Sequence, residues 1–203
     1  MGTRGCYGFR IDGKDKLTYN HFDSYPSGLG LSILQYAHDR SMKNMTEVAK
    51  RIKLVCSKKP TKKQIQICKK YADLGVSTGK IDDWYCLLRD AQGNLEAHDT
   101  VPFMIDSSEF VYDSLFCEWA YIINLDTKVL EIYKGFNKNP NEKGRYAGQK
   151  EKVPAGQKEP EYYGVRLVYE LPLKDLRAMK KVEVNAFAAK LHEKLEKEEA
   201  LEA

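Results

Sequence analysis

Long hydrophobic runs are absent from this sequence. No stretch approaches the roughly 20 apolar residues that a helix needs to cross a bilayer. The chain is polar from residue 2 onward and lacks the apolar core of a secretion signal. A disulfide framework is also lacking, because the five cysteines are odd in number and form no disulfide-like pattern, which is typical of a reducing compartment. These absences predict a soluble, cytoplasmic protein.

Motifs that bind metals or nucleotides are lacking as well. The sequence has no Cys-x-x-Cys and no His-x-x-x-His, and Cys56 and Cys68 are twelve positions apart, whereas structural zinc sites use more closely spaced ligand pairs. The glycines at 28 and 30 fit neither a P-loop nor a dinucleotide fingerprint. We therefore expect no metal and no cofactor. The motifs leave open whether the protein is an enzyme.

Enough apolar residues are present for a sizeable core. The 203 residues are 42% hydrophobic, 31% charged and 11% aromatic, and a chain of this length buries about 70% of its unfolded surface. The predicted fold is one α+β domain over 1–203, in which a largely antiparallel sheet built from hairpins is packed by helices. We expect hairpins at 4–22 and 118–134, strands at 84–89 and 162–171, and helices at 28–39, 45–56, 61–74 and from about 174 onward.

Three segments have a distinctive composition. Thr61 and Gln64 match a capping box, so 43–74 is predicted to be a basic helical hairpin. Residues 135–160 hold four Gly and three Pro among many charges, which predicts a mobile loop. Residues 193–203 hold five Glu and two Lys, which predicts a frayed, charged tail.

Positive charge is concentrated in one part of the chain. Residues 43–70 carry ten Lys or Arg against one acid, Glu47, a net charge of +9, whereas the whole chain carries +4, so everything else sums to −5. Such a segment can attract nucleic acid or another polyanion by neutralising phosphates; a solvated polar face is the alternative. The ten residues are Lys43, Lys50, Arg51, Lys53, Lys58, Lys59, Lys62, Lys63, Lys69 and Lys70.

The first hairpin suggests a catalytic site. A turn centred on 13–14 would set Cys6 opposite His21, and Arg4 opposite Asp23, with Cβ atoms about 5 Å apart. A thiol beside an imidazole can become a thiolate nucleophile, and a carboxylate can orient the imidazole. In this hypothesis Cys6 is the nucleophile, His21 the base, Asp23 the orienting acid and Arg4 the anion holder. The alternative is a surface ion pair beside a space-filling thiol and an ordinary strand histidine.

Glycines before the helix at 28–39 offer a second anion site. Gly28 and Gly30 could leave N–H groups free for a phosphate close to Arg4. The alternative is that these glycines only permit a tight turn into the helix.

The N-terminal segment resembles a scattered family of uncharacterised microbial and viral proteins. The resemblance rests on residues 1–5 (MGTRG) and 19–30 (YNHFDSYPSGLG), and more loosely on 118–121, and it transfers no activity. The strand–turn–strand start is also distantly similar to N-terminal-nucleophile hydrolases. Those enzymes use a first-residue Cys, Ser or Thr, whereas removal of Met1 here would expose Gly2, which has no side chain.

Two functional hypotheses follow. The first is a non-enzymatic binding or assembly protein that contacts a polyanion, such as a nucleic acid, or a protein partner through 43–70. The second is a small hydrolase-like or transferase-like enzyme whose site is Cys6, His21 and Asp23.

Overall fold

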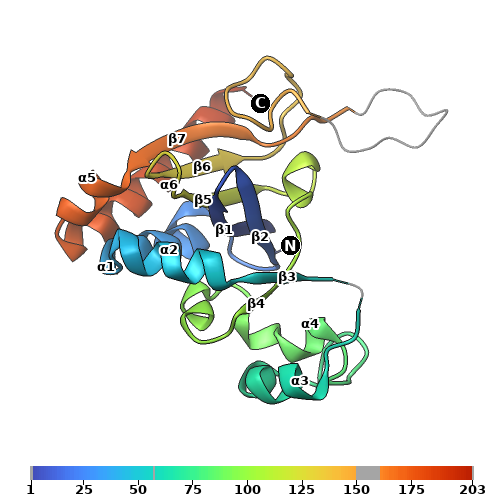
Figure 1. The fold of residues 1–203 in the computed structure, drawn as a ribbon. Helices are drawn as coiled ribbons and strands as arrows, with labels where there is room; N and C mark the ends of the chain where they lie inside the picture. Colours follow the sequence, from blue (N-terminus) through green and yellow to red (C-terminus); the bar gives the residue numbers. More distant parts are fainter. Residues whose placement is uncertain (1, 57, 150–160, 203) are drawn as a thin grey trace.

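The computed structural model describes residues 2–56, 58–149 and 161–202. Its centre is a five-stranded sheet in the order β2-β1-β5-β6-β7 (Figure 1). β1 and β5 pair in parallel, and the other neighbours are antiparallel. Helices pack against this sheet, so the predicted α+β class is confirmed. The strands are β1 (Gly5–Ile11), β2 (Lys14–Asn20), β5 (Trp119–Asn124), β6 (Val129–Lys134) and β7 (Arg166–Pro172).

A two-residue turn joins β1 to β2. Asp12 and Gly13 both have positive φ, 52° and 71°, as the tight type I′ hairpin turn requires. Further along β1, Gly8 lies so close to β2 that a Cβ there would be 2.0 Å from the carbonyl oxygen of Lys16. The hairpin therefore needs glycine at this position.

Helices cover one face of the sheet (Figure 1). They are α1 (Leu31–Asp39), which follows the short π-helical turn η1 (Pro26–Gly30), α2 (Met42–Arg51), α5 (Leu173–Ala178) and α6 (Lys181–Glu202). Their buried side chains share one apolar cluster with Tyr7, Phe9 and Ile11 of β1. The opposite face packs Cys6, Ile122 and Tyr133 against loop residues, including those around η5 (Phe110–Tyr112).

Residues 53–105 form a smaller unit beside the sheet (Figure 1). β3 (Lys53–Val55) pairs in parallel with β4 (Phe103–Ile105). An apolar cluster that includes Trp84 and Phe103 holds the unit together. Its helices are α3 (Lys62–Cys68), α4 (Trp84–Leu87), η2 (Lys69–Tyr71), η3 (Arg89–Ala91) and η4 (Leu95–Asp99).

Two elements differ from the sequence-based expectation. The basic segment 43–74 contains two helices, but β3 separates them, so it is not a helical hairpin. Residues 84–89 are helical rather than extended. The side chain of Asp83 caps α4 by accepting the N–H of Tyr85 at 2.9 Å, and a cap of this kind favours a helix start.

Two predicted flexible segments are partly described. Of the expected mobile loop 135–160, residues 135–149 form turns and bends, and residues 150–160 lie outside the described residues. The buried side-chain amide of Asn137 stabilises this loop by donating to the carbonyls of Ala147 and Gly164. The expected frayed tail 193–203 is helical as far as Glu202, and Ala203 lies outside the described residues. Leu195 packs into the core and anchors the end of α6.

Among the described residues, every helix is too short or too polar to cross a bilayer.

Candidate functional site

The first hairpin has a different register from the predicted one. The turn at Asp12 and Gly13 sets Cys6 opposite Tyr19, not opposite His21. His21 lies beyond the end of β2, and Asp23 lies in the exposed turn that follows, with φ 52°. The predicted pairing of Cys6 with His21 is therefore wrong. Residue 4 and Asp23 lie outside the paired strands, so their predicted pairing stays a prediction.

Cys6 lies in the apolar cluster on the sheet face away from the helices. Its side chain is 0% exposed, and its sulfur is 3.8 Å from the sulfur of Cys117. Burial, together with the neighbouring thiol, raises the pKa of Cys117 well above its ordinary value. A fully buried sulfur cannot meet a substrate, so this geometry gives the proposed nucleophile no support.

The other residues of the predicted catalytic cluster lie near the surface. His21 Nδ1 is 2.7 Å from the hydroxyl of Tyr19. The guanidinium of Arg4 lies over the ring of Phe116, 4.6 Å from its centroid. The backbone N–H of Arg4 donates to the carboxylate of Glu118. The structure thus gives His21 a hydroxyl partner and Arg4 an aromatic one.

The glycines before α1 do not present free N–H groups. Gly28 donates its N–H to the carbonyl of Tyr25 at 3.0 Å, and Gly30 donates to the same carbonyl at 3.3 Å. Between them, Leu29 donates to Asp23 at 2.8 Å. Because these donors are already used inside the turn, the expected anion site at Gly28 and Gly30 is not formed.

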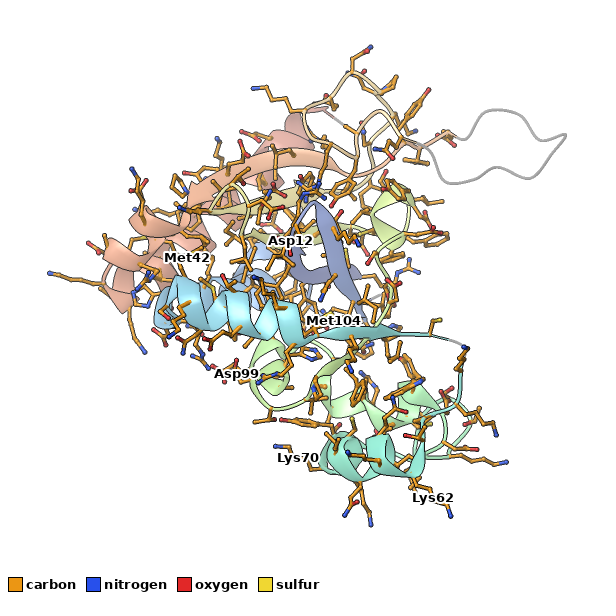
Figure 2. The ribbon with its side chains drawn as sticks, in the orientation of Figure 1. Asp12, Met42, Lys62, Lys70, Asp99 and Met104 are labelled. Carbon is orange, nitrogen blue, oxygen red and sulfur yellow. The ribbon has the colours of Figure 1, made fainter. Side chains whose placement is uncertain are left out.

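The basic residues of 43–70 are all at the surface. Each of the ten Lys and Arg side chains is exposed. We call these ten residues the basic strip; they lie on α2, on β3, in the loop after β3, on α3 and on η2. Figure 2 shows Lys62 of α3 and Lys70 of η2 pointing away from the body of the protein.

Few of these charges are neutralised within the chain. Among the described residues, only Lys59 of the strip forms an ion pair, with Asp82 at 2.7 Å, and this contact raises the pKa of Lys59. Arg51 donates to the carbonyls of His98 and Asp99. Lys70 lies over the ring of Tyr71, 4.8 Å from its centroid.

The backbone beneath the basic strip is ordered by specific contacts. In α3, Thr61 and Gln64 form the capping box that the sequence predicted. The indole of Trp84 donates to the carbonyl of Lys58 at 2.7 Å. Lys16 of β2 donates to the carbonyls of Ala49 and Ile52 and so caps the end of α2. The described backbone of the strip is therefore held by specific hydrogen bonds and carries long, charged side chains.

A Ser–His–Glu contact, which the sequence did not reveal, joins η1 to α6. Ser27 Oγ is 2.7 Å from His192 Nδ1, and His192 Nε2 is 3.4 Å from Glu196. The ring of Tyr25 stacks on His192 with centroids 4.9 Å apart. The order resembles a catalytic triad, but the adjacent N–H groups that could hold an oxyanion already donate to carbonyls. We assign this contact the role of docking α6.

A partly buried charged network was also invisible in the sequence. The Glu131 carboxylate, with a side chain 5% exposed, accepts from Asn124 at 2.7 Å, from Tyr133 at 3.1 Å and from Arg145. Arg145 also lies 3.5 Å from Asp15. Burial raises the pKa of Tyr133, which keeps its hydroxyl a donor. Because residues 15 and 145 are far apart in the chain, no short-range signal could have indicated the network.

The described residues contain no group of three or more His, Cys, Asp or Glu side chains that could hold a metal ion.

Comparison of the chain with protein-family models, with curated proteins and with solved structures found no match.

Proposed function

We propose that this chain is a non-enzymatic binding protein that holds the phosphate backbone of a nucleic acid on the basic strip. One observation carries the proposal: all ten cations are exposed, and nine of them form no ion pair with the described residues. Cations that are not neutralised by a carboxylate of the chain remain available to an external anion.

Charge segregation supports the same function. The strip segment carries +9 and everything else sums to −5. Each phosphate that a lysine neutralises releases condensed counterions, and this release drives binding independently of base sequence. A nucleic acid would therefore be attracted to this side of the molecule.

The spacing of the lysines fits a row of phosphates. Lys62 begins α3, and Lys69, seven residues later, begins η2 directly after it. On α2, Lys43 and Lys50 are also seven apart and lie opposite the buried Met45. Both helices thus present cations while their apolar sides remain in the protein.

Backbone contact, rather than base recognition, is the expected mode. Tyr71, the aromatic residue that follows Lys70, is already covered by that lysine. Trp84 is 6% exposed and packs in the apolar cluster. Without a free stacking platform, binding should depend little on base sequence.

The test replaces three strip residues, Lys50, Lys62 and Lys69, with glutamine together. All three are exposed and form no ion pair with the described residues, so the variant should fold normally. Fluorescence anisotropy with a labelled duplex of about 20 base pairs should show at least tenfold weaker binding and a salt slope smaller by about 3.

The matched control changes the same amount of charge elsewhere. Lys174, Lys180 and Lys190, on or beside α5 and α6, are exposed and form no ion pair with the described residues. Their triple replacement by glutamine should change the affinity much less. Equal losses in the two triple variants, or no binding by the unmodified protein at low salt, would overturn the proposal.

A further inference from the structure

A separate pocket lies beside η5, away from the basic strip. Its volume is about 230 Å³. The walls include three aromatic rings, from Tyr112, Phe116 and Tyr162, and two carboxylates, from Asp113 and Glu161. The backbone N–H of Val165 donates to the carbonyl of Val111 at 2.8 Å, and this hydrogen bond joins the two chain segments that line the pocket.

Glu161 pairs with Lys138, so Asp113 is the carboxylate of this pocket that is more available to an incoming cation. Its carboxylate accepts the N–H of Phe116 at 3.3 Å, but it forms no ion pair with the described residues. Burial raises its pKa above the ordinary value. The charge of Arg4 acts in the opposite direction and lowers this pKa, but it forms no ion pair with Asp113. A partly dehydrated carboxylate without a direct ion pair gains more from an incoming cation than an exposed one does.

Cations of the chain itself already lie on the rings at the rim. The guanidinium of Arg4 is 4.6 Å from the ring centroid of Phe116. Lys138 Nζ is 5.0 Å from the centroid of Tyr162 and 2.6 Å from the carboxylate of Glu161. The faces of Phe116 and Tyr162 therefore attract positive charge, and an incoming cation competes with Arg4 and Lys138 for them.

We propose that this pocket binds an alkylguanidinium or alkylammonium group, with Asp113 as the anionic partner and the aromatic rings as the walls. Such a group could belong to a free amine or to an arginine or lysine side chain of a peptide. The site is distinct from the basic strip, and its existence does not depend on nucleic-acid binding.

To test this, the full chain is titrated with small cations, and binding is monitored by ¹H–¹⁵N NMR. Butylguanidinium and butylammonium should shift the amides of 112–116 saturably, whereas the neutral isostere butylurea should not. A capped Gly-Arg-Gly peptide distinguishes the two sources, since tighter binding than that of butylguanidinium indicates a peptide side chain and equal or weaker binding indicates a free amine.

Two variants change the affinity in opposite directions. Asp113→Asn should weaken butylguanidinium binding by about tenfold or more, because it removes the carboxylate that would pair with the ligand. Lys138→Ala should strengthen it a few-fold, because it removes a competing cation from Glu161 and Tyr162. Asp90→Asn, at an exposed carboxylate outside the pocket, should leave the affinity unchanged.

Three results would overturn the proposal. The first is equal shifts with butylurea, and the second is an unchanged affinity in a folded Asp113→Asn protein. The third is no saturable shift up to about 20 mM butylguanidinium, a concentration well above the millimolar dissociation constant of a weak complex.

Discussion

A single buried histidine gives the molecule a predictable response to acid. His98 is 2% exposed, and its Nδ1 lies 3.3 Å from the carbonyl of Val101. Burial lowers its pKa from 6.5 to about 4. The imidazole therefore stays neutral in the folded state while it takes up a proton in the unfolded chain.

The sign of the pH effect follows from this difference. Between pH 6.5 and about 4 the unfolded state binds more protons at His98, so the free energy of unfolding falls as the pH falls through this window. The loss from this one group should be roughly 2–3 kcal/mol at about pH 4.5. Urea unfolding of the unmodified protein and of His98→Asn at several pH values measures it.

The comparison of these two proteins isolates His98. His38 has a pKa raised first by its hydrogen bond to Asp39, so its stabilisation is present at low pH and is lost as the pH rises. That contribution is the same in both proteins and cancels. If the His98→Asn protein lost as much unfolding free energy between pH 6.5 and 4.5 as the unmodified protein, the pH effect could not be assigned to His98.

A one-residue change in the turn of the first hairpin changes which residue lies opposite Cys6. The sequence correctly predicted a hairpin, since Asp-Gly is a strong turn signal. Moving the turn from 13–14 to 12–13 replaced His21 by Tyr19 opposite Cys6. The positive φ of Asp12 places the turn at 12–13. A residue other than glycine adopts a positive φ only at an energetic cost, and the sequence alone does not show that Asp12 does so.

At the scale of elements, the network around Glu131 joins the loop 137–149 to the sheet. Arg145 in the loop donates to Glu131 of β6, and Tyr146 donates to Asp15 of β2 at 2.7 Å. The loop therefore depends on charged contacts as well as on apolar packing.

Replacing Arg145 with methionine should destabilise the protein strongly. The change leaves the 5%-exposed carboxylate of Glu131 without its cation, and breaking one side of a buried pair costs about 3–5 kcal/mol. Urea unfolding of Arg145→Met should show this loss. The double variant Arg145→Met/Glu131→Leu should recover much of it. A loss below about 1 kcal/mol in the single variant would show that solvent screens the pair.

The elements that sequence reasoning missed are those that depend on distant partners. β3 is three residues long and exists through its pairing with β4, some fifty residues away in the chain. The apolar run at 84–89 was compatible with strand or helix, and periodicity cannot separate the two over so short a run. The capping box at Thr61 was predictable because both of its residues are local.

At the scale of the whole molecule, the distribution of charge was predictable and the contacts were not. Charge adds along the chain, so the +9 of the basic segment could be counted directly. The class of fold also followed from hairpin and helix patterns. In contrast, the contact of Ser27 with His192 joins residues 165 positions apart, which only the folded chain brings together.

The central claim is that the basic strip neutralises the phosphates of a nucleic acid. The most direct measurement is the affinity for a labelled duplex at several salt concentrations between about 50 and 200 mM. The logarithm of the association constant should fall linearly with the logarithm of the salt concentration, with a slope of about −5 or steeper, since each neutralised phosphate contributes about −0.9. A slope near zero, or no binding at the lowest salt, would contradict the claim.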